Sequence, residues 1–279
     1  MRPKTKRHLY LETLSKYSTL NSNDQQLLQQ ENRGYQGEYL FEEALKKLAK
    51  KASVVSKDLS LKIEQQKVQI DFLLTDGATL YVTEIKNYTP DMIYTEKGWF
   101  TTDGQHAYHD PTAQTMRATT LIRNLLQANN IQIPVAGLII FINDLMHVTL
   151  KATPPVTVLM KSQIHAFIKD WSAPTTSSIE QLNRLLLSYA EDVEPFTAHK
   201  NLARMMPICQ NCGNILKIHH RTCSCFCGKK FTKSEIYRTS IQDLSVLFPN
   251  KMITYRFFKE KTRLNISSHT FYKLRTRIL

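Results

Sequence analysis

The sequence predicts an α/β protein that ends in a small cysteine-containing module and a three-helix module. Three observations support this prediction. Two apolar runs separated by an Asp-Gly pair are typical of a β-hairpin. Segments with helical and strand-like apolar patterns follow one another around this hairpin. All five cysteines lie between Cys209 and Cys227, ahead of a strongly basic end of the chain.

The N-terminal part is expected to be helical. Residues 1–33 are polar with loosely spaced leucines, which predicts a helical arm that packs on the main domain. Residues 34–52 then show apolar side chains at helical spacing, and Glu38 lies on their stripe because it precedes Leu45 by seven residues. Its carboxylate is therefore expected to face the core. The alternative is that Glu38 only favours a helix N-terminus through the helix dipole.

The hairpin at residues 69–87 brings two acids and a lysine to one face of a sheet. With a two-residue Asp-Gly turn, Asp71 falls opposite Val82 and diagonal to Glu84. Lys86 shares this face because side chains alternate along a strand. Charged side chains are rarely buried unless they are paired or bind a metal, so the trio predicts chemistry. The alternative is an exposed face on which the charges happen to meet.

Further elements are expected after the hairpin. A short strand and turn surround Trp99, and Asp110 is expected as the N-cap of a helix with proline at its first turn. Gln114 lies on the inward stripe of this helix, either as a site residue or as a satisfied core or first-turn amide. The remaining expected elements of this domain are strands at residues 135–142 and 156–160, a short helix at 162–171, a polar linker at 172–178 and a closing helix at 179–191.

Charge and hydropathy restrict the location and the partner. No apolar stretch is long enough to span a bilayer and the N-terminus lacks the apolar core of a signal peptide, which predicts a cytoplasmic protein without membrane association. Residues 200–279 contain 16 Lys/Arg against 3 Asp/Glu, and this surplus equals the net charge of +13 because residues 1–199 contain 21 of each. Localised positive charge predicts nucleic acid as the partner, with an acidic membrane surface as the less favoured alternative.

Residues 207–232 are expected to form a zinc ribbon, because clustered cysteines in a reducing compartment indicate a metal rather than disulfides. The second cysteine pair is irregular, so Cys223 remains an alternative to Cys225 as a ligand. His219 and His220 are further alternatives, although adjacent histidines in a basic loop more often contact solvent or phosphate. The four preferred Zn²⁺ ligands are Cys209, Cys212, Cys225 and Cys227.

Residues 238–279 are expected to form a helix-turn-helix-like module with helices at 241–248, 254–262 and 268–278. The last helix has an apolar stripe, and three basic residues lie off it, where they could enter a nucleic-acid groove. These residues are Lys273, Arg275 and Arg277. The alternative is a small helical cap whose basic residues are merely solvated.

Five sequence elements together resemble the nuclease-related domain (NERD) family, a branch of the PD-(D/E)xK nuclease superfamily. The resemblance covers residues 34–168 and implies a mixed sheet flanked by helices, with a domain extending over 34–191. The sequence departs from the family pattern at Phe72, where histidine is common, and at residues 88–90, where glycine is expected. The elements, in the order of the family, are GxxGE at residues 34–38, QID at 69–71, EIKN at 84–87, Trp99, and DPxxQ at 110–114.

This resemblance implies a metal-dependent nuclease whose expected substrate is DNA. Asp71 and Glu84 would hold Mg²⁺ or Mn²⁺, and Glu38 would hold a second ion or a ligand water. Lys86 would orient the attacking water or stabilise phosphate charge. Gln114 would position Lys86 or the substrate backbone. The alternative is a non-catalytic DNA-binding or regulatory protein that uses a degenerate nuclease scaffold.

Overall fold

The computed structural model describes residues 3–48, 53–63, 65–106, 110–172, 176–191, 205–262 and 264–278. Contacts within the chain define two compact units. We call residues 33–194 the sheet unit, and residues 1–32 together with 195–279 the ribbon unit. Helix α2 (Ser22–Leu48) begins in the ribbon unit and continues into the sheet unit.

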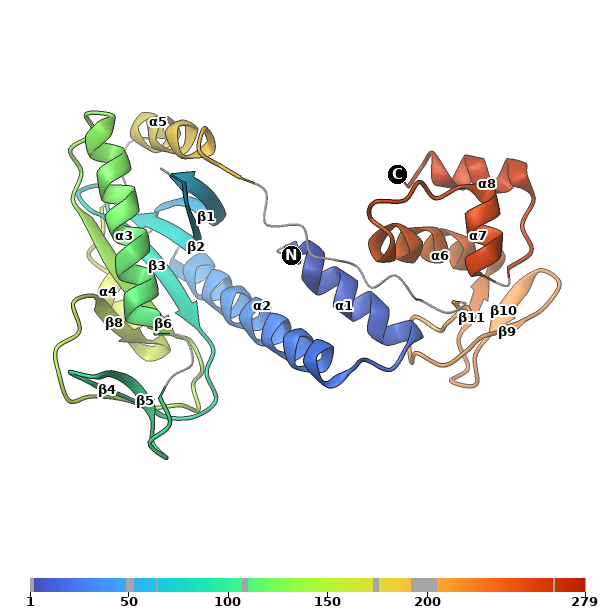
Figure 1. The fold of residues 1–279 in the computed structure, drawn as a ribbon, viewed down its shortest axis with the longest axis horizontal. Helices are drawn as coiled ribbons and strands as arrows, with labels where there is room; N and C mark the ends of the chain where they lie inside the picture. The colour runs from blue at the N-terminus through green and yellow to red at the C-terminus, as the bar shows by residue number, and fades with distance from the viewer. Residues whose placement is uncertain are drawn as a thin grey trace. The chain divides into compact units, whose positions relative to one another are not determined.

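A five-stranded mixed sheet forms the centre of the sheet unit (Figure 1). Its strand order is β1-β2-β3-β6-β8, in which the first three strands are antiparallel and the last three are parallel. The predicted mixed sheet between helices is therefore confirmed. The strands are β1 (Ser53–Ile63), β2 (Gln66–Thr75), β3 (Leu80–Lys86), β6 (Val135–Phe141) and β8 (Thr157–Met160).

Helices cover both faces of this sheet. Helix α3 (Pro111–Ala128) packs through Leu121 and Ile122 on the face that carries Val82, and α5 (Thr176–Leu187) adds to the same apolar cluster. The sheet-unit part of α2 and the short α4 (Ile164–Ile168) pack on the other face, where Phe41 meets Phe72. One 3₁₀ turn, η1 (Lys161–Gln163), precedes α4.

A second sheet has the order β5-β4-β7, with β4 (Met92–Thr95), β5 (Gly98–Thr101) and β7 (Val148–Leu150).

The turn of the central hairpin differs from the prediction. Thr75 pairs with Leu80, so four residues connect the strands instead of two. The cause is the side chain of Asp76, whose Oδ1 accepts hydrogen bonds from the backbone N–H groups of Ala78 (2.8 Å) and Thr79 (2.6 Å). Such local side-chain bonds compete with the tight turn.

The wider turn moves the strand register by two residues. Val82 pairs with Leu73, so the predicted pairing of Asp71 with Val82 is wrong, and Asp71 continues the ladder toward Glu84. A shift of two residues preserves the face of every side chain, because alternation along a strand has a period of two. The two acids therefore still share one face.

Helix α2 is longer than the sequence suggested. It runs for 27 residues from Ser22, so the expected arm and the expected helix at residues 34–52 join into one element. Glu38 lies well inside this helix. The alternative explanation of Glu38 as a first-turn acid is therefore wrong, because the dipole effect is confined to the first and last turns.

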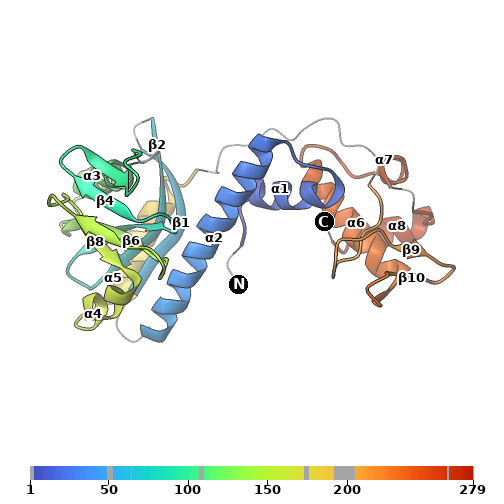
Figure 2. The same cartoon turned by 90° about the horizontal axis from the view of Figure 1, so that it is seen from below.

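The ribbon unit combines the N-terminal helix with the C-terminal modules. Its three-stranded sheet has the order β11-β10-β9, and the three C-terminal helices lie together beside it (Figures 1 and 2). Helix α6 begins at Lys233, earlier than predicted, because Thr232 and Glu235 form a capping box. The elements are α1 (Lys6–Tyr17), β9 (Lys217–Ile218), β10 (Thr222–Ser224), β11 (Lys230–Thr232), α6 (Lys233–Leu247), α7 (Tyr255–Lys261) and α8 (Ser268–Arg275).

The N-terminal arm packs on a different partner from the one expected. Tyr10, Leu11 and Leu14 of α1 are buried in the core of the ribbon unit, which also contains residues of the cysteine module and of α6 to α8. The Tyr17 hydroxyl donates a hydrogen bond to Asp243 of α6 at 2.5 Å. The prediction that this arm packs on the main domain is therefore wrong.

None of the helices in the described part of the chain combines the length and apolar character needed to cross a membrane.

Residues 173–175 of the expected linker lie outside the described residues.

Candidate functional site

An acidic cluster lies on the α3 face of the central sheet. Lys86 on β3 donates to the Oε1 of Glu84 at 2.6 Å and to the Oε1 of Gln114 on α3 at 3.1 Å. Asp71 on β2 accepts a hydrogen bond from the backbone N–H of Ile85 at 2.8 Å, which fixes its carboxylate beside β3. The structure thus brings together four of the residues that the sequence singled out.

The cluster is buried enough to perturb its own ionisation. Asp71 and Glu84 are each only 7% exposed. Burial, and then the neighbouring charge of Asp71, raise the pKa of Glu84 to about 7, although Lys86 and a hydrogen bond from Gln114 act in the opposite direction. Burial is the largest single influence on the pKa of Lys86 and lowers it, but Glu84, Tyr88 and Asp71 together outweigh burial and raise this pKa. The two buried acids repel each other, and a divalent cation bound between them would relieve this repulsion.

The start of α3 places Gln114 over the strand. Asp110 caps the helix by accepting from the backbone N–H groups of Thr112 and Ala113, as predicted. Trp99 is fully buried and its indole N–H donates to the Thr112 hydroxyl at 2.8 Å. The DPxxQ element and the tryptophan therefore form one support, which holds the Gln114 amide against Lys86.

Glu38 is half-buried on α2, next to the point where this helix meets the end of β3. A Cβ built on Gly37 would lie 2.8 Å from the Cβ of Asn87, so the helix can approach only because this residue is glycine. The Asn87 side-chain amide donates to the backbone carbonyl of Arg33 at 3.0 Å. Since Asn87 follows Lys86 directly, these contacts hold α2 against the end of β3, one residue beyond the acidic cluster. The role of Glu38 in holding an ion remains a prediction.

Phe72 and Tyr88 lie close to the residues of the cluster along the chain. Phe72 points to the opposite face and packs edge-on against Phe41, so this departure from the family pattern leaves the acidic cluster unchanged. Tyr88 was not singled out, yet its hydroxyl interacts electrostatically with Lys86 and Glu84, and burial raises its pKa. Its position two residues after Lys86 is the signal that could have identified it.

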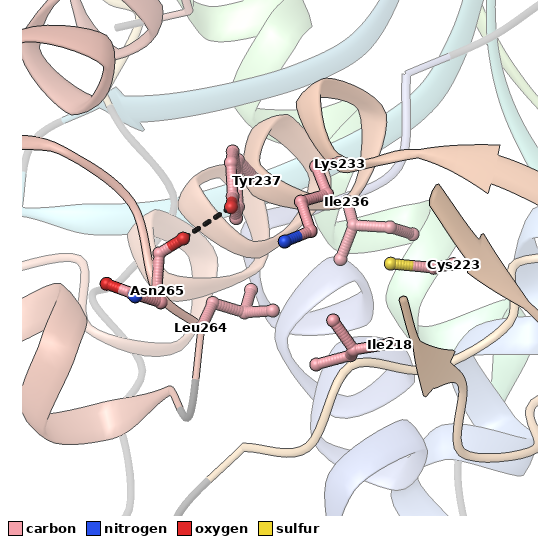
Figure 3. Close-up of a pocket in the computed structure, with 7 residues that line it drawn as sticks. All are labelled: Ile218, Cys223, Lys233, Ile236, Tyr237, Leu264 and Asn265. Atoms are coloured by element: carbon pink, nitrogen blue, oxygen red, sulfur yellow. Dashed lines mark hydrogen bonds between the residues drawn. The ribbon is translucent and has the colours of Figure 1, made fainter. Parts of the chain in front are cut away.

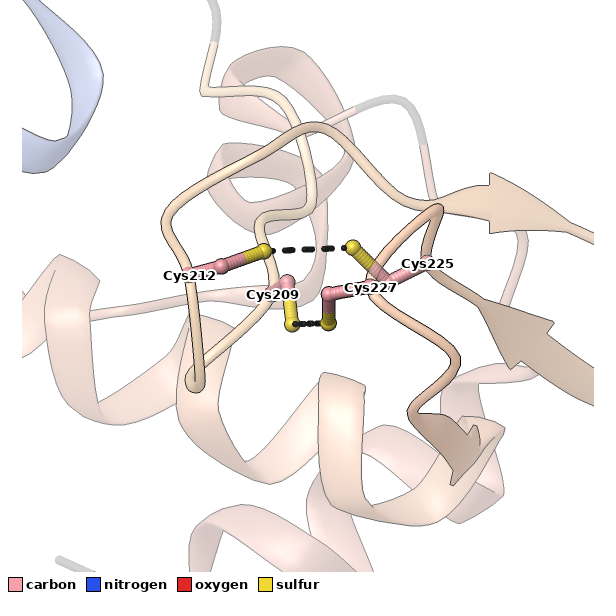
Figure 4. A group of neighbouring side chains, drawn as sticks. All are labelled: Cys209, Cys212, Cys225 and Cys227. Carbon is pink, nitrogen blue, oxygen red and sulfur yellow. Dashed lines mark hydrogen bonds between the residues drawn. The ribbon is translucent and has the colours of Figure 1, made fainter.

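The four preferred cysteines form a second candidate metal site (Figure 4). The Sγ atoms of Cys209 and Cys227 are 3.7 Å apart, those of Cys212 and Cys225 are 3.3 Å apart, and all four lie within 4.8 Å of one another. A tetrahedron with Zn–S bonds of about 2.3 Å has S···S edges of roughly 3.8 Å. The geometry fits Zn²⁺. Hydrogen bonds from the backbone N–H of Lys229 and from the neighbouring thiols lower the pKa of Cys227, while the pKa of Cys225 is raised.

The remaining candidate ligands of the cysteine module lie apart from this group. Cys223 is fully buried in β10, where its ladder partners are Ile218 and Phe231, and it is outside the group of four. His219 is hydrogen-bonded through Nε2 to the Ser224 hydroxyl. The pairing of Cys225 with Cys227 therefore agrees with the geometry, whereas the alternatives do not.

The predicted nucleic-acid-contacting residues lie on or just after α8. Lys273 and Arg277 are exposed, while Arg275 is half-buried. Phe271 and Leu274 fix the helix to the ribbon-unit core, as the apolar stripe predicted. Lys273 and Arg277 are therefore accessible to a polyanion, and contact of the three basic residues with nucleic acid remains a prediction.

The donor chemistry separates the two candidate metal sites. Asp71 and Glu84 offer hard carboxylate oxygens, and Mg²⁺ is commonly held by one or two carboxylates together with waters and substrate phosphate. Among the described residues, the cysteines are the group of three or more potential ligands that lie close enough to share one ion. A pair of carboxylates fits Mg²⁺ or Mn²⁺, and a set of four thiols fits Zn²⁺.

The mixed sheet and its acid-lysine cluster define an α/β domain of the nuclease-like class. Residues 33–142 match the model of a family described as Nuclease-related domain (NERD). The match ends just after β6, whereas the sheet unit continues through β8, α4 and α5. No curated protein and no solved structure gives a significant match to the chain.

Proposed function

We propose that the sheet unit is a metal-dependent nuclease that hydrolyses phosphodiester bonds in nucleic acid, with DNA as the expected substrate. The observation that carries this proposal is the convergence of Asp71, Glu84, Lys86 and Gln114 on one buried sheet face within a nuclease-related domain. Two neighbouring carboxylates raise each other's pKa when they are buried, and a divalent cation would favour the charged form of both.

Each side chain has a role that follows from its contacts. Asp71 and Glu84 would hold Mg²⁺ or Mn²⁺, and Glu38 would bind a ligand water or a second ion. A bound divalent ion would polarise the scissile phosphate and lower the pKa of a water ligand. Lys86 would leave Glu84 for the attacking water or a phosphate oxygen, and Gln114 would keep its ammonium group in position.

The ribbon unit would supply the affinity for nucleic acid. All of the net positive charge falls in residues 200–279, while the rest of the chain is balanced. Positive charge that is confined to one unit attracts phosphates with little sequence preference. Lys273, Arg275 and Arg277 are the residues that we propose to contact nucleic acid from α8, and Zn²⁺ would stabilise the neighbouring ribbon.

The test is cleavage of single-stranded, duplex and branched DNA and of RNA by the full chain, with Mg²⁺, with Mn²⁺ or with neither. Glu84→Gln and Lys86→Met should each reduce the rate at least about 100-fold, which is the usual loss when one charge-stabilising group is removed. The double variant should lose little more, since residues that act as a unit are not additive. Omission of the divalent ion is preferable to a chelator, because a chelator would also compete for the cysteine site.

The matched control is Glu43→Gln, which removes a carboxylate that is 41% exposed and paired with Lys46 on α2 of the same unit. This variant should cleave like the wild type. Retained cleavage in Glu84→Gln would refute the proposed site. Binding without cleavage of any of these substrates would favour the second candidate, a non-catalytic nucleic-acid-binding protein, which the concentration of charge in the ribbon unit also supports.

A further inference from the structure

The three-stranded sheet of the ribbon unit has one face that is covered by protein. Cys223 pairs with Ile218 on one side and with Phe231 on the other, so these three side chains share a face. Cys223 and Ile218 point toward Ile236 of α6 across a small cavity of about 90 Å³ (Figure 3). Cys223 and Phe231 on this inner face join the core of the unit, while Ile218 at its edge is 42% exposed.

The opposite face of the same sheet is basic. Ser224 pairs with Lys217 on one neighbouring strand and with Lys230 on the other, so the three residues form a row across the sheet. Since neighbouring strands are about 4.8 Å apart, the two lysine backbones lie roughly 10 Å from each other. Both lysines are exposed, and neither forms an ion pair with another described residue.

No acidic residue offsets this row within the module. Residues 207–232 contain four Lys/Arg and no Asp or Glu. A tetrathiolate zinc site would carry a charge of about −2, because four thiolates surround one Zn²⁺, so the module would stay positive. This face therefore carries a net positive charge, which favours an anionic partner.

An exposed aromatic ring lies next to the row. Phe226 is 96% exposed in the turn between Cys225 and Cys227. It follows Ser224 by two residues, so their Cα atoms are at most about 7 Å apart. The turn is closed by hydrogen bonds from Gly228 N–H to the Cys225 carbonyl and from Cys225 N–H to the Lys229 carbonyl. The hydrogen-bonded turn therefore presents a phenyl ring to solvent close in the chain to the row of Lys217, Ser224 and Lys230.

We propose that this surface, defined by Lys217, Ser224, Lys230 and Phe226, binds single-stranded nucleic acid. An unpaired base would stack on Phe226 while adjacent phosphates contact the two lysines. Base stacking on an aromatic ring requires an accessible base face, which a continuous duplex does not offer, and the combination of a ring with basic residues is typical of single-strand binding. The inference rests on the proposed function, because it assigns the unpaired region of the substrate to the ribbon.

The experiment measures binding of fluorescent oligo-dT and oligo-rU, and of a duplex of equal length, to the full chain without added Mg²⁺ or Mn²⁺. Phe226→Leu keeps an apolar side chain but removes the ring, and it should weaken single-strand binding about 5- to 150-fold, since stacking contributes ~1–3 kcal/mol per base. Phe226→Trp should retain the affinity. Duplex affinity should be the same for both variants and the wild type.

A salt series separates stacking from charge. Phe226→Leu should leave the slope of log K against log salt unchanged for oligo-dT. The double variant Lys217→Ala/Lys230→Ala should reduce that slope by about 1.4, because each phosphate contact to a single strand contributes ~0.7. Met252→Ala is the matched control, since it removes a side chain that is 71% exposed between α6 and α7, outside the ribbon. It should bind like the wild type.

Wild-type single-strand affinity in Phe226→Leu would overturn the inference, as would an equal loss for single strands and duplex. These outcomes are independent of the cleavage test. If cleavage requires Glu84 but single-strand binding does not require Phe226, this inference fails and the proposed nuclease function stands. If binding requires Phe226 but no substrate is cleaved, the binding surface stands and the nuclease function fails.

Discussion

Substitution of Glu84 by glutamine should stabilise the sheet unit in the absence of divalent ions, and the gain should depend on pH. The carboxyl group of Glu84 has an ordinary pKa of 4.5, and burial together with Asp71 raises this value to about 7 in the folded chain. The folded state therefore binds the Glu84 proton more tightly than the unfolded state. Stability contributed by the protonated form is fully present below pH 4.5 and is lost as the pH rises to about 7.

The magnitude follows from the two pKa values. A difference of about 2.5 between them corresponds to ~3 kcal/mol at 1.36 kcal/mol for each pH unit. The side chain of Glu84 is only 9% exposed, so solvent screening does not reduce this figure greatly. Glu84→Gln should thus match the wild type near pH 4 and exceed its unfolding free energy by up to about 3 kcal/mol near pH 8. The amide keeps the shape of the carboxyl group and lacks its charge.

The assay exploits the location of the two tryptophans. Trp99 and Trp171 both lie in the sheet unit and both are buried, so urea unfolding followed by tryptophan fluorescence reports on this unit and not on the ribbon unit. Glu43→Gln, at a half-exposed carboxylate of α2 that pairs with Lys46, provides the control and should show no comparable gain. Equal effects of Glu84→Gln at pH 4 and pH 8, or a loss of stability at pH 8, would refute the electrostatic reasoning. Addition of Mg²⁺ should stabilise the wild type and not Glu84→Gln.

Two further predictions concern packing and zinc. Gly37→Ala should lower the unfolding free energy of the sheet unit by about 1–3 kcal/mol, because its new Cβ would overlap the Cβ of Asn87. Gly34→Ala should instead raise this free energy by up to ~1 kcal/mol, because no atom lies within 4 Å of the new Cβ. Urea unfolding of both variants checks this, and equal effects of the two substitutions would contradict the close approach of α2 to Asn87. Elemental analysis of the wild type should give one zinc per chain, retained in Cys223→Ser and lost or weakened in Cys225→Ser, and the opposite order would reverse the ligand assignment.

The sequence was sufficient to place the acidic cluster but not to define its turn. Asp71, Glu84 and Lys86 share a face in any register that differs by an even number of residues, because side chains alternate along a strand. That property made the prediction robust to the wrong turn length. The turn itself depends on whether the Asp76 side chain binds backbone N–H groups, and an Asp-Gly pair is compatible with both outcomes.

Sequence patterns also identified buried faces without identifying their partners. The apolar spacing of α1 indicates that the helix is buried, yet it does not distinguish one apolar surface from another. The contact of Tyr17 with Asp243 joins residues 226 positions apart and has no local signature. Strand β1 was not predicted, although Leu59, Leu61 and Ile63 alternate as expected for a half-buried strand.

The acidic cluster is unfavourable for folding, and this cost supports a functional interpretation. Glu84 could be replaced by an amide of the same shape, which would keep a hydrogen-bonding partner for Lys86 and remove the repulsion from Asp71. A role in packing alone would favour that replacement. A bound divalent ion would make both carboxylates favourable, since it is held by their negative charges and offsets the repulsion between Asp71 and Glu84. The same carboxylate is therefore expected to destabilise the metal-free fold and to be required for cleavage. These two effects can be measured separately in one variant.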